Sequence, residues 1–179
     1  MTSIGNVYGE ALYSLACEEG LSKEILQELT ALEQSFAQEP AFLRLLDAPN
    51  LTKEERCQVL EDCFRGNIHG YVLNFLKLLT EKSYARQFGA CCAVYRNCYN
   101  EDNGILPVTA VTAVPLKESQ YTALSQKLAA VTGKTIQLHN RVDEAVLGGI
   151  RLDYNGIRLD DTLAHRLGDI RTKLKDTVL

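Results

Sequence analysis

The hydrophobic periodicity of the chain changes near residue 104, and this change constrains the fold more than any other feature of the sequence. Before residue 104, apolar residues recur at the three- and four-residue spacing that places them on one face of an α-helix. After it, runs rich in Val and Thr, which are typical of β-strands, alternate with two further helical stretches. We therefore expect an α+β chain with a helical domain over 1–104 and a small α/β domain over 105–179.

The first domain is expected to contain five or six helices. Ser22 is a candidate cap for the second helix, and Pro40 favours the start of a short third helix. Thr52 and Glu55 form a capping box, in which each side chain accepts a hydrogen bond from the backbone of the other residue. The helix expected over 68–81 is apolar on more than one face, as in a central or partner-covered helix. Short connections between these helices favour an antiparallel bundle.

The second domain is expected to contain a β-hairpin and a C-terminal helix. Asn155-Gly156 lies between two alternating strands and indicates a type I′ turn, which requires positive φ at both central residues. Asp160 or Asp161 is expected to cap the final helix, whose apolar stripe begins at Leu163. The two-residue loop predicts four cross-strand pairs: Tyr154 with Ile157 and Leu152 with Leu159 on one face, and Asp153 with Arg158 and Arg151 with Asp160 on the other.

Charge and hydropathy exclude several classes of protein. The net charge of −4 argues against a general nucleic-acid-binding protein, which usually carries a basic surplus. The charge is unevenly distributed along the chain. Residues 1–104 hold 9 Lys+Arg and 15 Asp+Glu, whereas residues 105–179 hold 10 Lys+Arg and 8 Asp+Glu. No apolar run approaches the about 18 residues that a membrane-spanning helix needs, and the N-terminus lacks the pattern of a signal peptide. We therefore expect neither nucleic-acid binding nor direct membrane insertion.

The sequence offers no clear catalytic site, and we expect no cofactor and no metal. Nucleotide-binding glycine motifs are absent, and the three histidines lack metal-ligand spacing. Gly148-Gly149 lies inside a strand pattern, which indicates a bulge or a close backbone approach rather than a phosphate site. The six cysteines are interpreted as small buried side chains in a reducing compartment. The alternative is a cytosolic thiol-dependent enzyme or redox sensor that uses Cys91, Cys92 or Cys98.

The remaining candidate for function is a surface for a partner. The first helix carries a wide apolar stripe, and the helix expected over 68–81 has more apolar surface than one core-facing side requires. Both surfaces could simply fill the core of the bundle. Alternatively, they form a groove that accepts an amphipathic helix from another protein.

Short motifs along nearly the whole chain carry a resemblance to a known family. In order, they are Tyr8, Ala11, Leu12 and Ala16; Asn74-Phe75-Leu76; Thr112-Ala113-Val114-Pro115-Leu116; Val142-Asp143; Gly148-Gly149-Ile150; and Asp160 with Thr162-Leu163. Their order and spacing resemble the delta subunit of F-type ATP synthases, whose mitochondrial counterpart is the oligomycin-sensitivity-conferring protein. One departure is Gly9, where the family usually has Ala; it is expected to weaken its helix by about 0.5–1 kcal/mol.

The resemblance implies a non-catalytic stator subunit, present once per complex at the cytoplasmic face of the cell membrane. It implies that 1–104 binds N-terminal helices of the alpha subunits and that 105–179 binds the b-type subunits of the peripheral stalk. The complex would make ATP with a proton or sodium gradient. The groove residues implied for alpha-subunit binding are Tyr8, Ala11, Leu12, Phe75, Leu76 and Leu79, and the family markers Gly148, Gly149 and Asp160 are expected to be structural.

Overall fold

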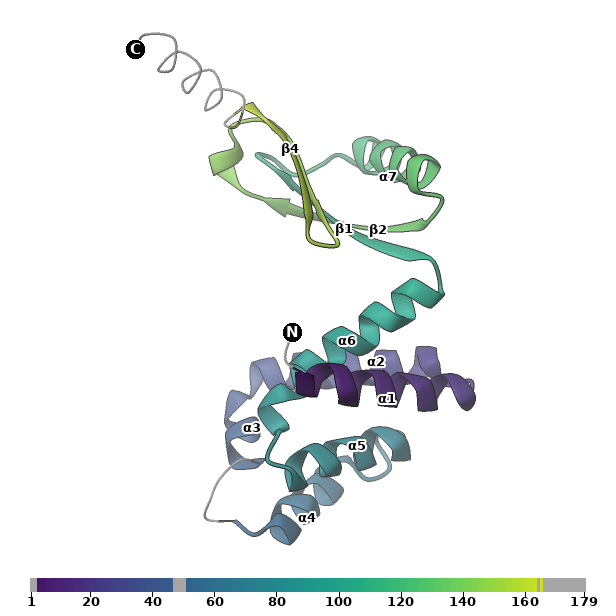
Figure 1. Cartoon of the computed structure of the whole chain (residues 1–179). Coiled ribbons are helices and arrows are strands. Elements are labelled where there is room, and N and C mark those ends of the chain that lie inside the picture. The colour runs from purple at the N-terminus through teal and green to yellow at the C-terminus, as the bar shows by residue number, and fades with distance from the viewer. Residues whose placement is uncertain (1–2, 47–50, 164, 166–179) are drawn as a thin grey trace, which may run out of the picture. The chain divides into compact units, whose positions relative to one another are not determined.

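The computed structural model describes residues 3–46, 51–163 and 165, and its mixed helical and sheet architecture confirms the α+β class. The chain divides into two compact units, Met1–Tyr99 and Asn100–Leu179 (Figure 1). The division falls five residues before the change in periodicity at residue 104. A helix that ends at Asp102 crosses this boundary.

The first unit is helical, as the periodicity predicts. The capping box is confirmed, since the Glu55 backbone N–H donates to Thr52 Oγ1 at 3.2 Å and the Thr52 N–H donates to Glu55 Oε2 at 2.8 Å. Ser22 is not a cap: it is the first helical residue, and Leu21 precedes it without a side-chain hydrogen bond. The helices are α1 (Ser3–Glu18), α2 (Ser22–Gln38), α3 (Pro40–Leu46), α4 (Lys53–Phe64), α5 (Gly70–Glu81) and α6 (Phe88–Asp102), with a 3₁₀ turn, η1 (Ala85–Gln87), before α6.

Phenylalanine rings from four helices meet in the core of this unit. Phe36 of α2 stacks on Phe42 of α3 at a centroid distance of 5.5 Å, and it meets Phe88 of α6 edge to face at 5.1 Å. Phe64 of α4 completes the cluster, 6.2 Å from Phe36. Such pairs contribute about 0.5–1.5 kcal/mol beyond the burial of their surface. The cluster therefore joins helices that are distant in sequence.

Gly9 allows α1 to approach α6 closely. A Cβ atom at this position would lie 2.7 Å from the Cys91 carbonyl oxygen and 2.8 Å from the Val94 Cβ. The lower helix propensity of glycine at this position is thus accompanied by direct packing of the α1 backbone on α6.

The second unit is a four-stranded sheet covered by a helix. Its elements are β1 (Ile105–Thr112), α7 (Glu118–Thr132), β2 (Thr135–Val142), the 3₁₀ turn η2 (Glu144–Val146), β3 (Gly149–Tyr154) and β4 (Ile157–Thr162), and the strand order is β2-β1-β3-β4. β1 and β2 are parallel and are connected through α7, whereas β1–β3 and β3–β4 are antiparallel. The Tyr121 hydroxyl of α7 donates to the Leu138 carbonyl oxygen at 2.6 Å, so α7 is anchored on β2.

The hairpin is confirmed in turn and in register. Asn155 and Gly156 have φ of 45° and 76°, the positive values that a type I′ turn requires. All four expected pairs are present: Tyr154–Ile157, Leu152–Leu159, Asp153–Arg158 and Arg151–Asp160.

The predicted cap of the final helix is wrong. Asp160 and Asp161 belong to β4, which extends to Thr162 because β3 continues to pair with it. The His165 backbone N–H donates to Thr162 Oγ1 at 3.2 Å, so Thr162 makes the contact that was expected of an aspartate. The expected stripe beyond Leu163 lies outside the described residues.

Gly149 begins β3 at a point where β4 leaves no space for a side chain. Its φ is +81°, and a Cβ atom would lie 2.5 Å from the Asp161 carbonyl oxygen and 3.1 Å from the Thr162 Cα. The prediction of a close backbone approach at Gly148-Gly149 therefore applies at Gly149.

The substitution Gly9→Ala is expected to destabilise the protein, although alanine is the better helix former. The added methyl group would overlap α6, and we expect the free energy of unfolding to fall by about 1–3 kcal/mol in urea denaturation followed by circular dichroism. Gly89→Ala is the matched control, because the nearest atom to its Cβ would be Glu33 Oε1 at 3.8 Å. The free energy of unfolding of this control should rise by about 0.5–1 kcal/mol. An equal rise for Gly9→Ala would contradict the close contact between α1 and α6.

Gly149→Ala is expected to destabilise the second unit more than Gly104→Ala does. Both positions have positive φ, but a Cβ at Gly104 would meet no atom within 4 Å. The free energy of unfolding of the control should therefore fall by only about 1–2 kcal/mol, the cost of left-handed backbone strain. That of Gly149→Ala should fall by about 1–3 kcal/mol more, because its methyl group also overlaps β4. Denaturation measured by Tyr fluorescence compares the two variants, and equal losses would show that β4 yields to the side chain.

Candidate functional site

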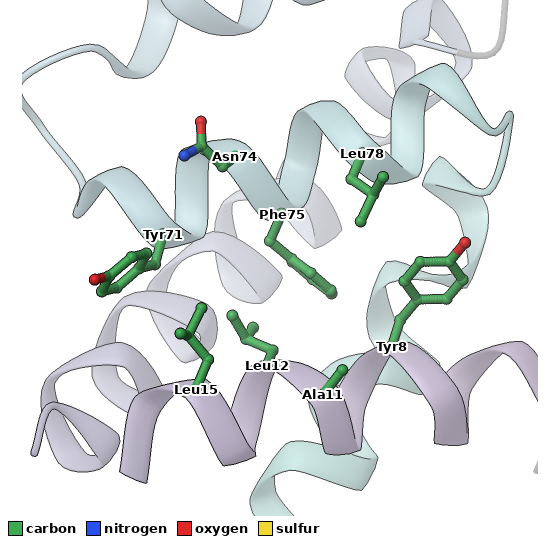
Figure 2. Close-up of a pocket in the computed structure, with 8 residues that line it drawn as sticks. All are labelled: Tyr8, Ala11, Leu12, Leu15, Tyr71, Asn74, Phe75 and Leu78. Carbon is green, nitrogen blue, oxygen red and sulfur yellow. The ribbon is translucent and has the colours of Figure 1, made fainter. Parts of the chain in front are cut away.

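A groove lies between α1 and α5 in the first unit. Its volume is about 270 Å³, and it is open to solvent along exposed leucines on both helices. Each of the two helices packs against α2, which leaves the space between them. The groove residues are Tyr8, Ala11, Leu12 and Leu15 of α1 and Tyr71, Asn74, Phe75 and Leu78 of α5 (Figure 2).

Each helix divides its apolar residues between the core and the groove. On α1, Tyr13 and Ala16 are buried in the core, whereas Leu15 lines the groove and is 36% exposed. On α5, Val72 is fully buried in the core, whereas Leu78 lines the groove and is 39% exposed. Exposed leucines in a concave surface are typical of a site that accepts an apolar partner.

Tyrosines stand at the two ends of the groove (Figure 2). The pKa of Tyr71 is raised because the negative charge of Glu19 lies beside it, because it is partly desolvated, and because its hydroxyl donates to the Glu19 carboxylate. At the other end, Tyr8 contacts Tyr84 edge to face at a centroid distance of 6.2 Å. These contacts hold the end residues in place.

The structure brings four of the six expected groove residues together. Leu76 and Leu79 do not line the groove, because both are buried in the core of the first unit. The residues that sequence reasoning missed are Leu15, Tyr71, Asn74 and Leu78. Helical spacing from Leu12 and Phe75 could have found the three apolar ones, whereas Asn74 gives no hydrophobic signal.

The three family markers lie in the second unit, around the β3–β4 hairpin. A Cβ atom at Gly148 would lie 2.9 Å from Leu163 Cδ1, and Gly149 lies against the β4 backbone. Asp160 Oδ1 accepts a hydrogen bond from the Thr162 backbone N–H at 3.1 Å. The pKa of Asp160 is lowered chiefly by a hydrogen bond from the Thr162 side chain. All three residues thus make contacts within the fold.

Across residues 3–46, 51–163 and 165, no group of three or more His, Cys, Asp and Glu side chains is arranged to hold a metal ion. No helix in this part of the chain has the length and hydropathy to cross a membrane.

Comparisons with known proteins identify one family from the sequence and a shared fold from a solved structure. The model of the ATP synthase delta (OSCP) subunit family matches residues 4–174. The chain is 31% identical to the ATP synthase subunit delta of Syntrophomonas wolfei, over 97% of this chain and 95% of that protein. It is 29% identical to the ATP synthase subunit delta of Alkaliphilus oremlandii, over 93% of each. A chain of the Toxoplasma gondii mitochondrial ATP synthase hexamer shares the fold, with a TM-score of 0.78, 16% identity, and coverage of 97% of this chain and 98% of that chain.

The cysteines do not support the thiol-enzyme alternative. Cys91 and Cys92 are buried in the core, and burial raises the pKa of both thiols. Cys98 is half-buried and packs against the same core. A reactive cysteine requires a lowered pKa and access to solvent, so the buried pair has the opposite properties.

Thiol titration of the native protein is expected to show slow reaction of Cys91 and Cys92. At pH 8, their raised pKa leaves them protonated, and burial blocks the reagent; both become reactive only on unfolding. The interpretation of all six cysteines as buried is wrong for Cys17 and Cys63, which are exposed. These two provide the internal comparison and should react at once with Ellman's reagent. Rapid labelling of either buried cysteine in the folded protein, identified by mass spectrometry, would restore the redox hypothesis.

Proposed function

The chain belongs to the ATP synthase delta (OSCP) subunit family, and on this basis we propose that it is the non-catalytic stator subunit of an F-type ATP synthase. It links the alpha subunits of the catalytic head to the b-type subunits of the peripheral stalk, one copy per complex. It acts at the cytoplasmic face of the cell membrane and supports ATP synthesis driven by protons or sodium ions. It has no catalytic site of its own, because the chemistry belongs to other subunits.

The proposed role is mechanical. A stator must hold the head against the torque of the rotor, so slow dissociation matters more than fast association. The chain has two units, each attached to the same assembly. When one unit is bound, the effective concentration of the other unit at its own site is raised. The division into Met1–Tyr99 and Asn100–Leu179 is compatible with one unit for the head and one for the stalk.

The observation that carries the proposal is the apolar groove between α1 and α5. A helix lying along it would cover Leu15 and Leu78 and contact Phe75 at its floor. We assign this groove to the N-terminal helix of an alpha subunit. Of the residues expected to bind the alpha subunit, Tyr8, Ala11, Leu12 and Phe75 remain in the groove. Leu76 and Leu79 of α5 are core residues that support it.

The stalk is assigned to the second unit. Strand β4 is an edge of the sheet, and its apolar residues Ile157 and Leu159 are half-exposed. The sequence of this half carries 10 Lys+Arg and 8 Asp+Glu, opposite in net sign to the first half. These features support a second, chemically distinct attachment surface.

The substitution Leu78→Asp is expected to weaken binding to the head at least tenfold, because docking would bury an unpaired carboxylate. The full-length chain is titrated calorimetrically with a peptide from the N-terminus of the same organism's alpha subunit. Binding should show a negative heat-capacity change, as expected for burial of apolar surface. Leu45→Asp is the matched control, because Leu45 is 41% exposed against 39% for Leu78 but lies outside the groove. Equal affinities for two folded variants would exclude the groove assignment.

A further inference from the structure

Leu147 combines two properties that the fold of the second unit does not explain. Its φ is +60°, and its side chain is 67% exposed. We propose that Leu147 anchors a docking surface at one end of the sheet, and that the apolar face of a helix from the b-type stalk subunit covers this surface. The inference rests on the proposed function and deepens it by assigning the stalk contact to named residues.

The backbone of Leu147 has a conformation that leucine rarely adopts. Leu147 follows η2, and its backbone N–H donates to the Glu144 carbonyl oxygen at 3.2 Å. The left-handed position after a helical turn usually holds glycine and sometimes asparagine, because a Cβ atom is strained there. Among the described residues, the other non-glycine positions with positive φ are Ser83 and Asn155, whose side chains are short and polar. Leu147 is therefore a large apolar residue at a position whose backbone favours glycine.

The side chain of Leu147 contributes little to the core in return for this strain. The preceding residue, Val146, is buried, whereas Leu147 is not among the described residues that pack on the core of the sheet. Backbone strain that the fold does not repay with burial is expected at a functional position.

Three further exposed apolar residues lie at the same end of the sheet. The parallel strands β1 and β2 both end there, and the antiparallel pairs β1–β3 and β3–β4 mean that β3 begins there and β4 ends there. Val114 follows β1, Val142 ends β2, and Leu163 follows β4; each is at least 46% exposed. The Leu163 backbone N–H donates to the Gly148 carbonyl oxygen at 3.0 Å, so Leu163 lies beside the loop that carries Leu147. We call these four residues the sheet-end patch: Val114, Val142, Leu147 and Leu163.

A helix laid across the strand ends matches the spacing of the sheet-end patch. Neighbouring strands lie about 4.8 Å apart, and a helix advances about 5.4 Å per turn. Because the strand order is β2-β1-β3-β4, successive turns of one helix face would meet Val142, then Val114, then Leu147 with Leu163. An apolar stripe at three- and four-residue spacing supplies about one side chain per turn for these contacts.

The charges around the patch favour a basic partner helix. Four carboxylates and two lysine or arginine side chains lie at this end of the sheet, on the loops and on the ends of the elements. A helix whose apolar face is flanked by Lys and Arg complements this surface, whereas a second copy of the same patch would bring like charges together. The charged residues are Lys117, Glu118, Arg141, Asp143, Glu144 and Asp161.

Leu147→Asn separates binding from folding in the full-length chain. Asparagine adopts the left-handed conformation more readily than leucine, so the midpoint of urea denaturation should be unchanged or higher. Calorimetric titration with a soluble fragment of the same organism's b-type stalk subunit should show about 5- to 50-fold weaker binding, because an apolar contact is lost. Val131→Asn is the matched control, because Val131 is 85% exposed but lies near the end of α7, where the chain returns to the start of β2. The control should keep its affinity within about twofold.

Val142→Asn tests whether the surface extends across the sheet, and it should also weaken binding of the fragment several-fold. Equal affinity of Leu147→Asn and the unmodified chain would overturn this inference and leave the proposed function standing. Dimerisation of the unmodified chain in light scattering, abolished by Leu147→Asn, would assign the patch to a second copy and would also overturn it. Failure of the unmodified chain to bind the fragment would overturn both this inference and the assignment of the stalk to the second unit.

Discussion

The packing of α1 and α5 on a shared neighbour, α2, is the constraint on which the groove depends. Both helices bury one apolar sector against the common core, and neither closes tightly on the other. The remaining sectors, with Leu15 on one helix and Leu78 on the other, stay accessible. Exposed leucines cost solubility when they serve no partner, so their arrangement along one concave surface is consistent with a chain that functions inside an assembly.

Two glycines show how backbone contact, rather than side-chain size, holds parts of the fold together. Gly9 allows α1 to lie directly against Cys91 and Val94 of α6, and Gly149 allows the backbone of β3 to approach Asp161. In both cases, a residue with poorer intrinsic preference for its element gives closer packing. Helix propensity alone predicts that Gly9 weakens α1, whereas in the folded chain it allows α1 to pack closely on α6.

The second unit is held at the exit of β1 by one polar side chain. The Asn140 amide donates to the Ala110 carbonyl oxygen and to Thr112 Oγ1, each at 2.9 Å, and its Oδ1 accepts from the Leu116 backbone N–H at 2.9 Å. This network joins β2, β1 and the loop to α7. A fully satisfied side-chain network of this kind rigidifies its surroundings, so it fixes the relative positions of the two strands and the loop.

The sequence alone determined the features that depend on local contacts. Thr52 with Glu55 marked a helix start, and Asn155-Gly156 determined the hairpin and its register, because the interacting groups lie within a few residues of each other. Tertiary structure decided which sector of α5 faces the core. Helical spacing relates Leu76, Leu78 and Leu79 to one another, but the positions of α2 and α1 determine that two are buried and one lines the groove. Likewise, pairing with β3 carried β4 past Asp160 and moved the expected cap to Thr162, because a strand ends where its partner does.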